Sequence, residues 1–223
     1  ILSLVFRGPI LRDPRLAALR RLAWIWSAQN VLLAIAVYNR LFIYVGFNGM
    51  TRMRIVGFFG ISAVIAGFAL VVWKIACEKD FAWLIRRQIW ALAMAIYLFA
   101  LAPVDNLAVS YNVRRVLKGD LAASMQIGVQ PLDTEGILAV TPLLNCPDEI
   151  IREGVKALLA QRVDQLEVRQ RRYERYGWTA LQLADQVALK KLYRRCDHWE
   201  EYDDTVLQEK TLQRFYTYAY QWY

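Results

Sequence analysis

The sequence predicts an all-α membrane protein, with three transmembrane helices followed by a small extramembrane helical domain. Three long stretches in the first half contain no Asp, Glu, Lys, Arg or His, whereas the second half is charged and amphipathic. The net charge of +8 also divides unevenly: residues 1–110 hold 12 Lys and Arg against 4 Asp and Glu, and residues 111–223 hold 16 of each kind. A basic excess confined to the apolar half is typical of membrane-flanking segments and argues against nucleic-acid binding.

The three uncharged stretches are Leu22–Asn39, Ile55–Trp73 and Gln88–Val104. At 1.5 Å per residue, each approaches the ~30 Å thickness of a bilayer's hydrocarbon core. We therefore expect helices over about 22–46, 52–76 and 83–104, within a transmembrane region over 22–105 that follows a basic pre-membrane segment over 1–21. Taken alone, the first and third stretches also fit core helices of a soluble bundle, but they flank the most apolar stretch.

Lys and Arg residues beside the predicted helices indicate how the chain is oriented. Nine of them precede the first helix or lie between the second and third, whereas six lie between the first and second or follow the third. The more basic side of a membrane protein faces the cytoplasm. This bias predicts that the C-terminal half lies outside the cytoplasm.

Residues 106–223 are predicted to form an extramembrane α-helical domain with an aromatic tail. Asn145, Pro147 and the following acidic residues mark a helix start, and apolar residues then recur at intervals of three and four until Gly177. A second amphipathic segment runs over about 179–195, and a third begins near Asp203 or Thr205. Amphipathic segments joined by short turns predict a small helical bundle.

The aromatic tail carries Tyr216, Tyr218, Tyr220 and Trp222 at every second position. This alternation fits an extended strand, but a helix at a membrane surface or against a partner uses the same side chains differently. A tail with so few charges is expected to be covered, either by a partner or by the helical bundle itself. The four residues are therefore candidates for an interface.

Residues for catalysis are scarce, and the sequence predicts no enzyme, no metal site and no cofactor. His198 is the single histidine, the three cysteines Cys77, Cys146 and Cys196 stand far apart, and no glycine-rich phosphate-binding motif or nucleophile motif occurs. Two alternatives remain open: the acidic residues around His198 could hold Ca²⁺ or Mg²⁺, and Cys146 could form a disulfide with Cys196 if the C-terminal half is periplasmic.

Four segments resemble an uncharacterised bacterial multi-pass membrane family, the domain-of-unknown-function 4153/4173 group. They are NRLFIYVGFNGMTRMR over residues 39–54, APVDNLAVSYNVRR, PLDTEGILAVTPL and GWTALQLADQVAL, so the resemblance covers roughly residues 38–192. The pattern includes Arg40, Tyr44, Gly49, Thr51, Arg52, Arg54, Asn112 and Arg115. Met50 departs from it, since Leu is usual there. The resemblance implies a bacterial inner-membrane protein with further helices upstream, and it implies no activity.

The physical properties of these residues suggest contacts with headgroups or with a partner. Gly49 permits a tight turn or a positive φ, Thr51 is a good N-cap for the second helix, and Arg52 and Arg54 lie in its first turn at headgroup level. The lipid bilayer is the first expected partner, and other membrane subunits are the second. We therefore expect a non-catalytic membrane subunit that anchors or scaffolds a complex through its helical domain; the alternative is a transporter or channel component whose pathway is shared with other helices.

Overall fold

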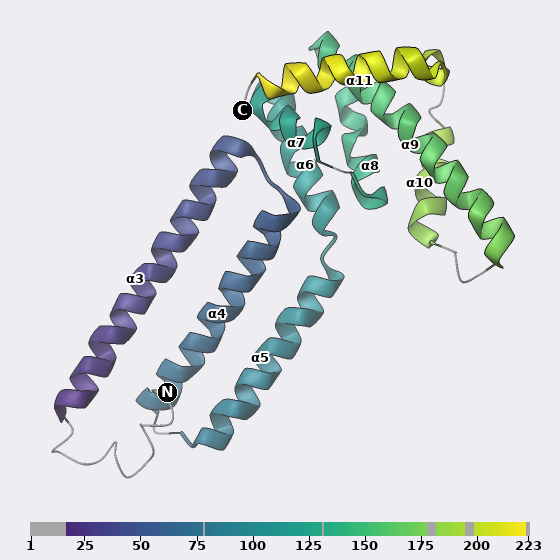
Figure 1. Ribbon diagram of the computed structural model, residues 1–223. Helices are drawn as coiled ribbons and strands as arrows, with labels where there is room; N and C mark the ends of the chain where they lie inside the picture. Colours follow the sequence, from purple (N-terminus) through teal and green to yellow (C-terminus); the bar gives the residue numbers. More distant parts are fainter. Residues whose placement is uncertain (1–16, 78, 131, 178–181, 195–198, 222–223) are drawn as a thin grey trace. The chain divides into compact units, whose positions relative to one another are not determined.

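The computed structural model describes residues 17–77, 79–130, 132–177, 182–194 and 199–221, and it shows helices joined by short connections throughout them (Figure 1). The chain forms two compact units. The membrane-helix unit comprises Ile1–Tyr44 and Met53–Ala102, and the helical domain comprises Val45–Arg52 and Pro103–Tyr223. The sequence placed residues 45–52 in the transmembrane region, whereas the structure groups them with the helical domain.

The membrane-helix unit is built from α3 (Ala17–Asn48), α4 (Arg52–Ala76) and α5 (Phe81–Leu101). Three segments are long and apolar enough to cross a membrane, namely Arg21–Asn48, Arg52–Ala76 and Phe81–Leu101, so the predicted helices are confirmed. The third was expected to reach residue 104, but α5 ends at Leu101. Pro103 explains the earlier end, because a proline disfavours helical backbone in the residue before it.

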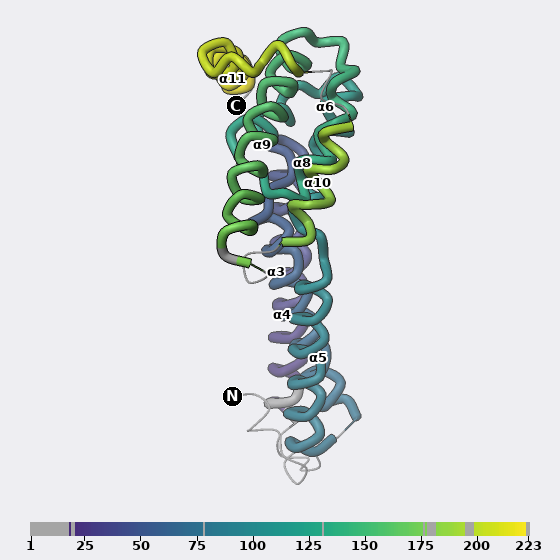
Figure 2. The backbone as a smooth tube through the Cα atoms, turned by 90° about the vertical axis from the view of Figure 1, so that its right-hand side faces the viewer, coloured from purple at the N-terminus to yellow at the C-terminus, as the bar shows by residue number. Residues whose placement is uncertain are grey.

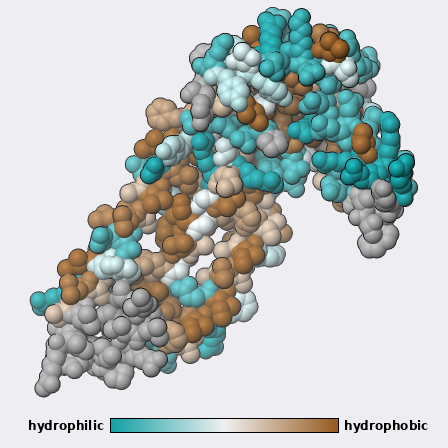
Figure 3. Space-filling view, in the orientation of Figure 1, coloured by the Kyte–Doolittle hydropathy of each residue, from teal (hydrophilic) through white to brown (hydrophobic). Residues whose placement is uncertain are grey.

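The three helices form a single layer in which α4 lies between α3 and α5 (Figures 1 and 2). Between α3 and α4, the Tyr38 hydroxyl lies 2.5 Å from the Ser62 hydroxyl. Between α4 and α5, the Gln88 side-chain amide donates to the Gly67 carbonyl at 2.8 Å. Only 6% of the most apolar window of each span is buried, and the surface of this unit is largely hydrophobic (Figure 3). The described residues thus leave both faces of the layer uncovered.

Within the described residues, the helical domain consists of nine α- and 3₁₀-helical segments, of which α9 is the longest. The elements in chain order are α6 (Val104–Leu117), η2 (Leu121–Ala123), α7 (Ser124–Gly128), α8 (Thr134–Val140), η3 (Thr141–Asn145), α9 (Glu149–Tyr176), α10 (Leu183–Tyr193), η6 (Glu200–Asp203) and α11 (Thr205–Tyr220). Asp148 caps α9 by accepting from the Ile151 amide at 3.1 Å, so the start lies after Asn145, and Gly177 ends the helix with φ +75°.

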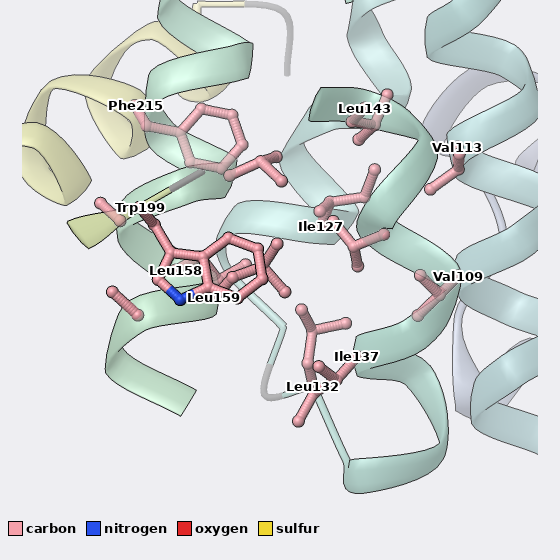
Figure 4. Packing of buried hydrophobic residues seen from close by; sticks show 14 of the residues in the cluster. Val109, Val113, Ile127, Leu132, Ile137, Leu143, Leu158, Leu159, Trp199 and Phe215 are labelled. Carbon is pink, nitrogen blue, oxygen red and sulfur yellow. The ribbon is translucent and has the colours of Figure 1, made fainter. Parts of the chain in front are cut away.

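The core of the helical domain lies between α6, α8, α9 and α11. Figure 4 shows side chains from α6, α7, α9 and α11, including Val113, Ile127, Leu159 and Phe215, converging on one another. The closest approach is at Gly154 in α9, where an added Cβ would lie 2.4 Å from the Phe215 ring. A larger residue at 154 would therefore displace α11 from the core.

Extraction tests whether hydrocarbon surrounds α3, α4 and α5. We expect the full chain to stay in the membrane fraction during alkaline carbonate or high-salt washing, because apolar burial holds it there and salt screens only the charges. Immunoblotting of the pellet and supernatant measures this, with a peripheral membrane protein as the released control. Release of the chain by salt would contradict the membrane assignment.

Candidate functional site

The connection between α3 and α4 contains a glycine that the structure requires. Gly49 has φ +77°, and its amide donates to the Val45 carbonyl at 3.0 Å. A Cβ at this position would lie 2.7 Å from Oδ1 of Asn112. The positive φ and the lack of space both favour glycine, so the predicted turn with positive φ is confirmed.

Asn112 on α6 holds the same connection by both polar atoms of its amide. Its Oδ1 accepts from the Met50 backbone N–H at 2.7 Å, and its Nδ2 donates to the Met50 carbonyl at 2.7 Å. Asn112 is only 2% exposed. The side chain thus satisfies both backbone polar groups of Met50, much as a neighbouring strand would, in a place where water has little access.

Arg115, one turn further along α6, binds the last turn of α3. Its guanidinium donates to the Val45 carbonyl at 2.7 Å and to the Gly46 carbonyl at 2.6 Å. Asp120 holds the guanidinium from the other side, with Nε donating to Oδ2 at 2.8 Å. A helix ends with carbonyls that lack partners within the helix, and a cation is favourable there. We call Gly49, Met50, Asn112 and Arg115 together the loop clasp.

Arg52 adds an ion pair beside the loop clasp. It donates to Asp105 at 2.8 Å and lies 3.7 Å from Asp133, but its side chain is 63% exposed. Exposed pairs of this kind contribute little to stability. Thr51 directly precedes α4, as expected for its cap position.

The remaining residues of the sequence pattern belong to the membrane-helix unit. Arg40 donates to the Tyr44 hydroxyl at 3.3 Å and lies 5.5 Å from the centre of its ring. Arg54 lies in the first turn of α4 and is partly buried. The structure therefore brings Gly49, Asn112 and Arg115 together in one set of contacts, while Arg40 and Tyr44 form a local pair.

The aromatic tail forms a helix, so the strand alternative is wrong. Within α11, Tyr216 is half-buried against the core and the Tyr218 hydroxyl donates to Asp148 at 2.6 Å. This hydrogen bond raises the pKa of Tyr218. Tyr220 is exposed, and Trp222 lies outside the described residues. Most of the described tail is thus covered by the helical domain itself.

Sequence analysis missed a polar group around Glu153 on α9. The Tyr202 hydroxyl donates to Glu153 Oε2 at 2.8 Å, and Lys156 Nζ lies 3.1 Å from Oε1. Burial acts to raise the pKa of Glu153, but hydrogen bonds from Tyr202, Lys156 and Arg152 outweigh it, so that the pKa lies below its ordinary value. Burial raises the pKa of Tyr202, and its bond to Glu153 raises it further. Only the spacing of Glu153 and Lys156 is visible in the sequence.

A groove of about 250 Å³ in the helical domain is lined by carboxylates and by the aromatic side chains Tyr193 and Trp199. Its carboxylates come from Asp164, Glu167, Glu200 and Asp203, around Trp199. Among the described residues, no group of three or more His, Cys, Asp or Glu side chains is arranged to hold a metal ion. His198 and Cys196 lie outside the described residues, so the Ca²⁺ or Mg²⁺ site and the disulfide stay untested, as does the expectation that the chain is not an enzyme.

The Asn112→Ala variant tests how strongly the loop clasp contributes. It leaves the Met50 N–H and carbonyl without a partner, and we expect the free energy of unfolding to fall by about 2–4 kcal/mol. Denaturant unfolding of the full chain in detergent, followed by Trp fluorescence, measures the change. Arg114→Ala on the same helix is the control and should stay within ~0.5 kcal/mol, because that side chain is exposed. Equal stability of the two variants would contradict a stabilising role.

Acid titration tests the polar group around Glu153. Because folding lowers the pKa of Glu153, its stabilising contribution is complete above the ordinary value of 4.5 and is lost as the pH falls through the folded value. We expect the melting temperature of the Glu153→Gln variant to fall less steeply than that of the wild type as the pH drops below about 4.5. Glu174→Gln, at an exposed position on the same helix, should retain the wild-type slope. If the melting temperature falls equally with pH in the wild type and both variants, Glu153 does not contribute to the pH dependence of stability.

Comparison with known proteins places these features in a family. A search of curated proteins and a search of solved structures each return no significant match. A family model described as Domain of unknown function (DUF4153) matches residues 2–141. The match includes α3 to α8 and therefore the loop clasp, but not the GWTALQLADQVAL segment that also resembled the family. Because the match covers more than half of the chain, this membrane protein belongs to the DUF4153 family of unknown function.

Proposed function

We propose that this protein is a non-catalytic integral membrane subunit, which anchors or scaffolds a larger bacterial membrane complex through its helical domain. The observation that carries the proposal is the loop clasp. Asn112 and Arg115, which the sequence pattern singles out as contacts for lipid headgroups or a partner, are instead engaged by the chain's own backbone. Side chains used in this way build a fixed structure and do not provide free groups for chemistry.

The membrane-helix unit supports an anchoring role with partners in the bilayer. The three spans bury only 6% of their most apolar windows, so lipid or helices of other subunits must cover the rest. The proposed location is the bacterial inner membrane, with the helical domain in the periplasm. The excess of Lys and Arg before α3 and between α4 and α5 supports this orientation.

One observation favours the alternative, a component of a transporter or channel. Gln29, Asn39 and Arg40 are exposed on α3, where they are available to line a pathway shared with other helices. Asn30 does not join them, because its amide donates to the Trp26 carbonyl of its own helix at 2.7 Å. Polar side chains at membrane depth are typical of transport pathways, but they also occur in helix interfaces.

Labelling with a membrane-impermeant maleimide distinguishes the two roles and the orientation. Single-cysteine chains would carry Gln29→Cys, Val206→Cys or the native Cys77, with the other natural cysteines replaced. For an anchoring subunit, we expect the Gln29→Cys variant to stay unlabelled in intact and in opened spheroplasts. Val206 is 73% exposed in the helical domain, so Val206→Cys should react in intact spheroplasts, whereas Cys77 should react only after opening.

Two results would count against these proposals separately. Labelling of the Gln29→Cys variant would show water at that depth and favour the transport alternative over the anchoring role. The opposite pattern for Cys77 and Val206→Cys would place the helical domain in the cytoplasm. Mass-shift gels of the purified full chain measure both.

A further inference from the structure

Two tryptophans and an arginine form a cluster where α4 ends and α5 begins (Figure 1). The ring centres of Trp73 on α4 and Trp83 on α5 lie 6.4 Å apart. The guanidinium carbon of Arg87 lies 5.8 Å from the centre of the Trp83 ring. We call these three residues the indole–arginine cluster. Trp73 is 58% exposed, and Arg87 is exposed as well, so the cluster is open to the surroundings of the membrane-helix unit.

The indole–arginine cluster offers hydrogen-bond donors only. An indole carries one N–H, a guanidinium carries five, and neither group accepts a hydrogen bond. Among the described residues, none accepts a hydrogen bond from these three side chains. Asp80, the described carboxylate nearest to Arg87 in the sequence, forms no ion pair with it. A group that satisfies the cluster must therefore be an acceptor, and the charge of Arg87 favours an anion.

Arg87 lies within the third span and not in the connection before it. The span is Phe81–Leu101, and at 1.5 Å per residue Arg87 lies about 9 Å along the helix from Phe81. Side chains of a helix point back toward its start, and the contact of Arg87 with Trp83, one turn earlier, follows that direction. The guanidinium thus reaches toward the headgroups, where lipid phosphate is the abundant anion and tryptophan is common.

The arginines near the opposite ends of the spans differ, because the chain itself engages them. Arg52 pairs with Asp105 at 2.8 Å, and Arg40 donates to the Tyr44 hydroxyl at 3.3 Å. Around the indole–arginine cluster, residues 74–90 contain four Lys and Arg against two Asp and Glu. This unbalanced positive charge complements an anionic headgroup better than a zwitterionic one, which carries its own cation beside the phosphate.

We propose that the indole–arginine cluster binds the phosphate of an anionic phospholipid, with Arg87 as the charged contact and the two indole N–H groups as further donors. The acyl chains of the bound lipid follow the same face of α5 into the membrane. Trp90, Met94 and Leu98 continue that face at three, seven and eleven positions after Arg87, and all three are exposed. This inference requires only the three spans, and it goes beyond the proposed anchoring role.

Native mass spectrometry of the full chain in detergent tests the site, with phosphatidylglycerol as the probe and phosphatidylcholine as the zwitterionic reference. We expect the wild type to bind phosphatidylglycerol about tenfold more tightly than phosphatidylcholine. Arg87→Gln should weaken the binding of phosphatidylglycerol about tenfold. Arg21→Gln is the matched control, because it removes the same charge from an exposed position on α3, and its effect should stay below about twofold.

Two further variants separate the geometry of the cluster from its charge. Trp83→Leu keeps every charge but removes the ring under the guanidinium and one N–H donor, so phosphatidylglycerol should bind about threefold more weakly. Arg87→Lys keeps the charge without the five donors of the guanidinium, and it should bind more tightly than Arg87→Gln but less tightly than the wild type. Circular dichroism of each purified variant confirms that the helices remain.

The lipid site is overturned if the wild type binds the two lipids equally, or if Arg87→Gln and Arg21→Gln weaken binding equally, since only total charge would then matter. Displacement of bound phosphatidylglycerol by inorganic phosphate alone also overturns it, because the cluster would then be a site for a soluble anion. These failures leave the anchoring role standing, because that role is tested by the maleimide labelling of Gln29→Cys.

Discussion

The hydrogen bonds between Asn112 and the backbone N–H and carbonyl of Met50 are the interaction on which the helical domain depends. Residues 45–52 must reverse direction between two apolar helices, and a reversing backbone exposes N–H and carbonyl groups that cannot pair with each other. Asn112 and Arg115 supply the missing partners from one face of α6, and Gly49 leaves room for the amide to approach. Each of these residue types is needed for a different reason, and none acts alone.

The two units are stabilised by different forces. In the helical domain, Phe215, Ile127 and Leu159 leave water and the hydrophobic effect drives their packing. Between α3, α4 and α5 that force is absent, since lipid is as apolar as the side chains. Contacts such as Gln88 with the Gly67 carbonyl therefore matter more than apolar area. The same reasoning explains why exposed amides on α3 require explanation while exposed leucines do not.

The helical class and the three membrane spans could be predicted because both depend on local composition. The positive φ of Gly49 could also be predicted, since few other residues tolerate it. The clasp itself could not, because Asn112 and Met50 are 62 positions apart and only the folded chain brings them together. The alternation of Tyr216 and Tyr218 fits a strand, but the segment is a helix that packs Phe215 closely against Gly154 of α9, a contact between residues distant in sequence.

The helical domain is discontinuous in sequence, and this limits how it can be isolated. A fragment that begins at Pro103 would contain α6 to α11 but not residues 45–52, so Asn112 would expose an amide that is 2% accessible in the intact chain. A fragment that ends at residue 141 would lack α9 and α11 and uncover the apolar side chains of α6 and α8. A soluble version for crystallisation therefore has to graft residues 45–52 onto the start of α6, with a linker in place of α4 and α5.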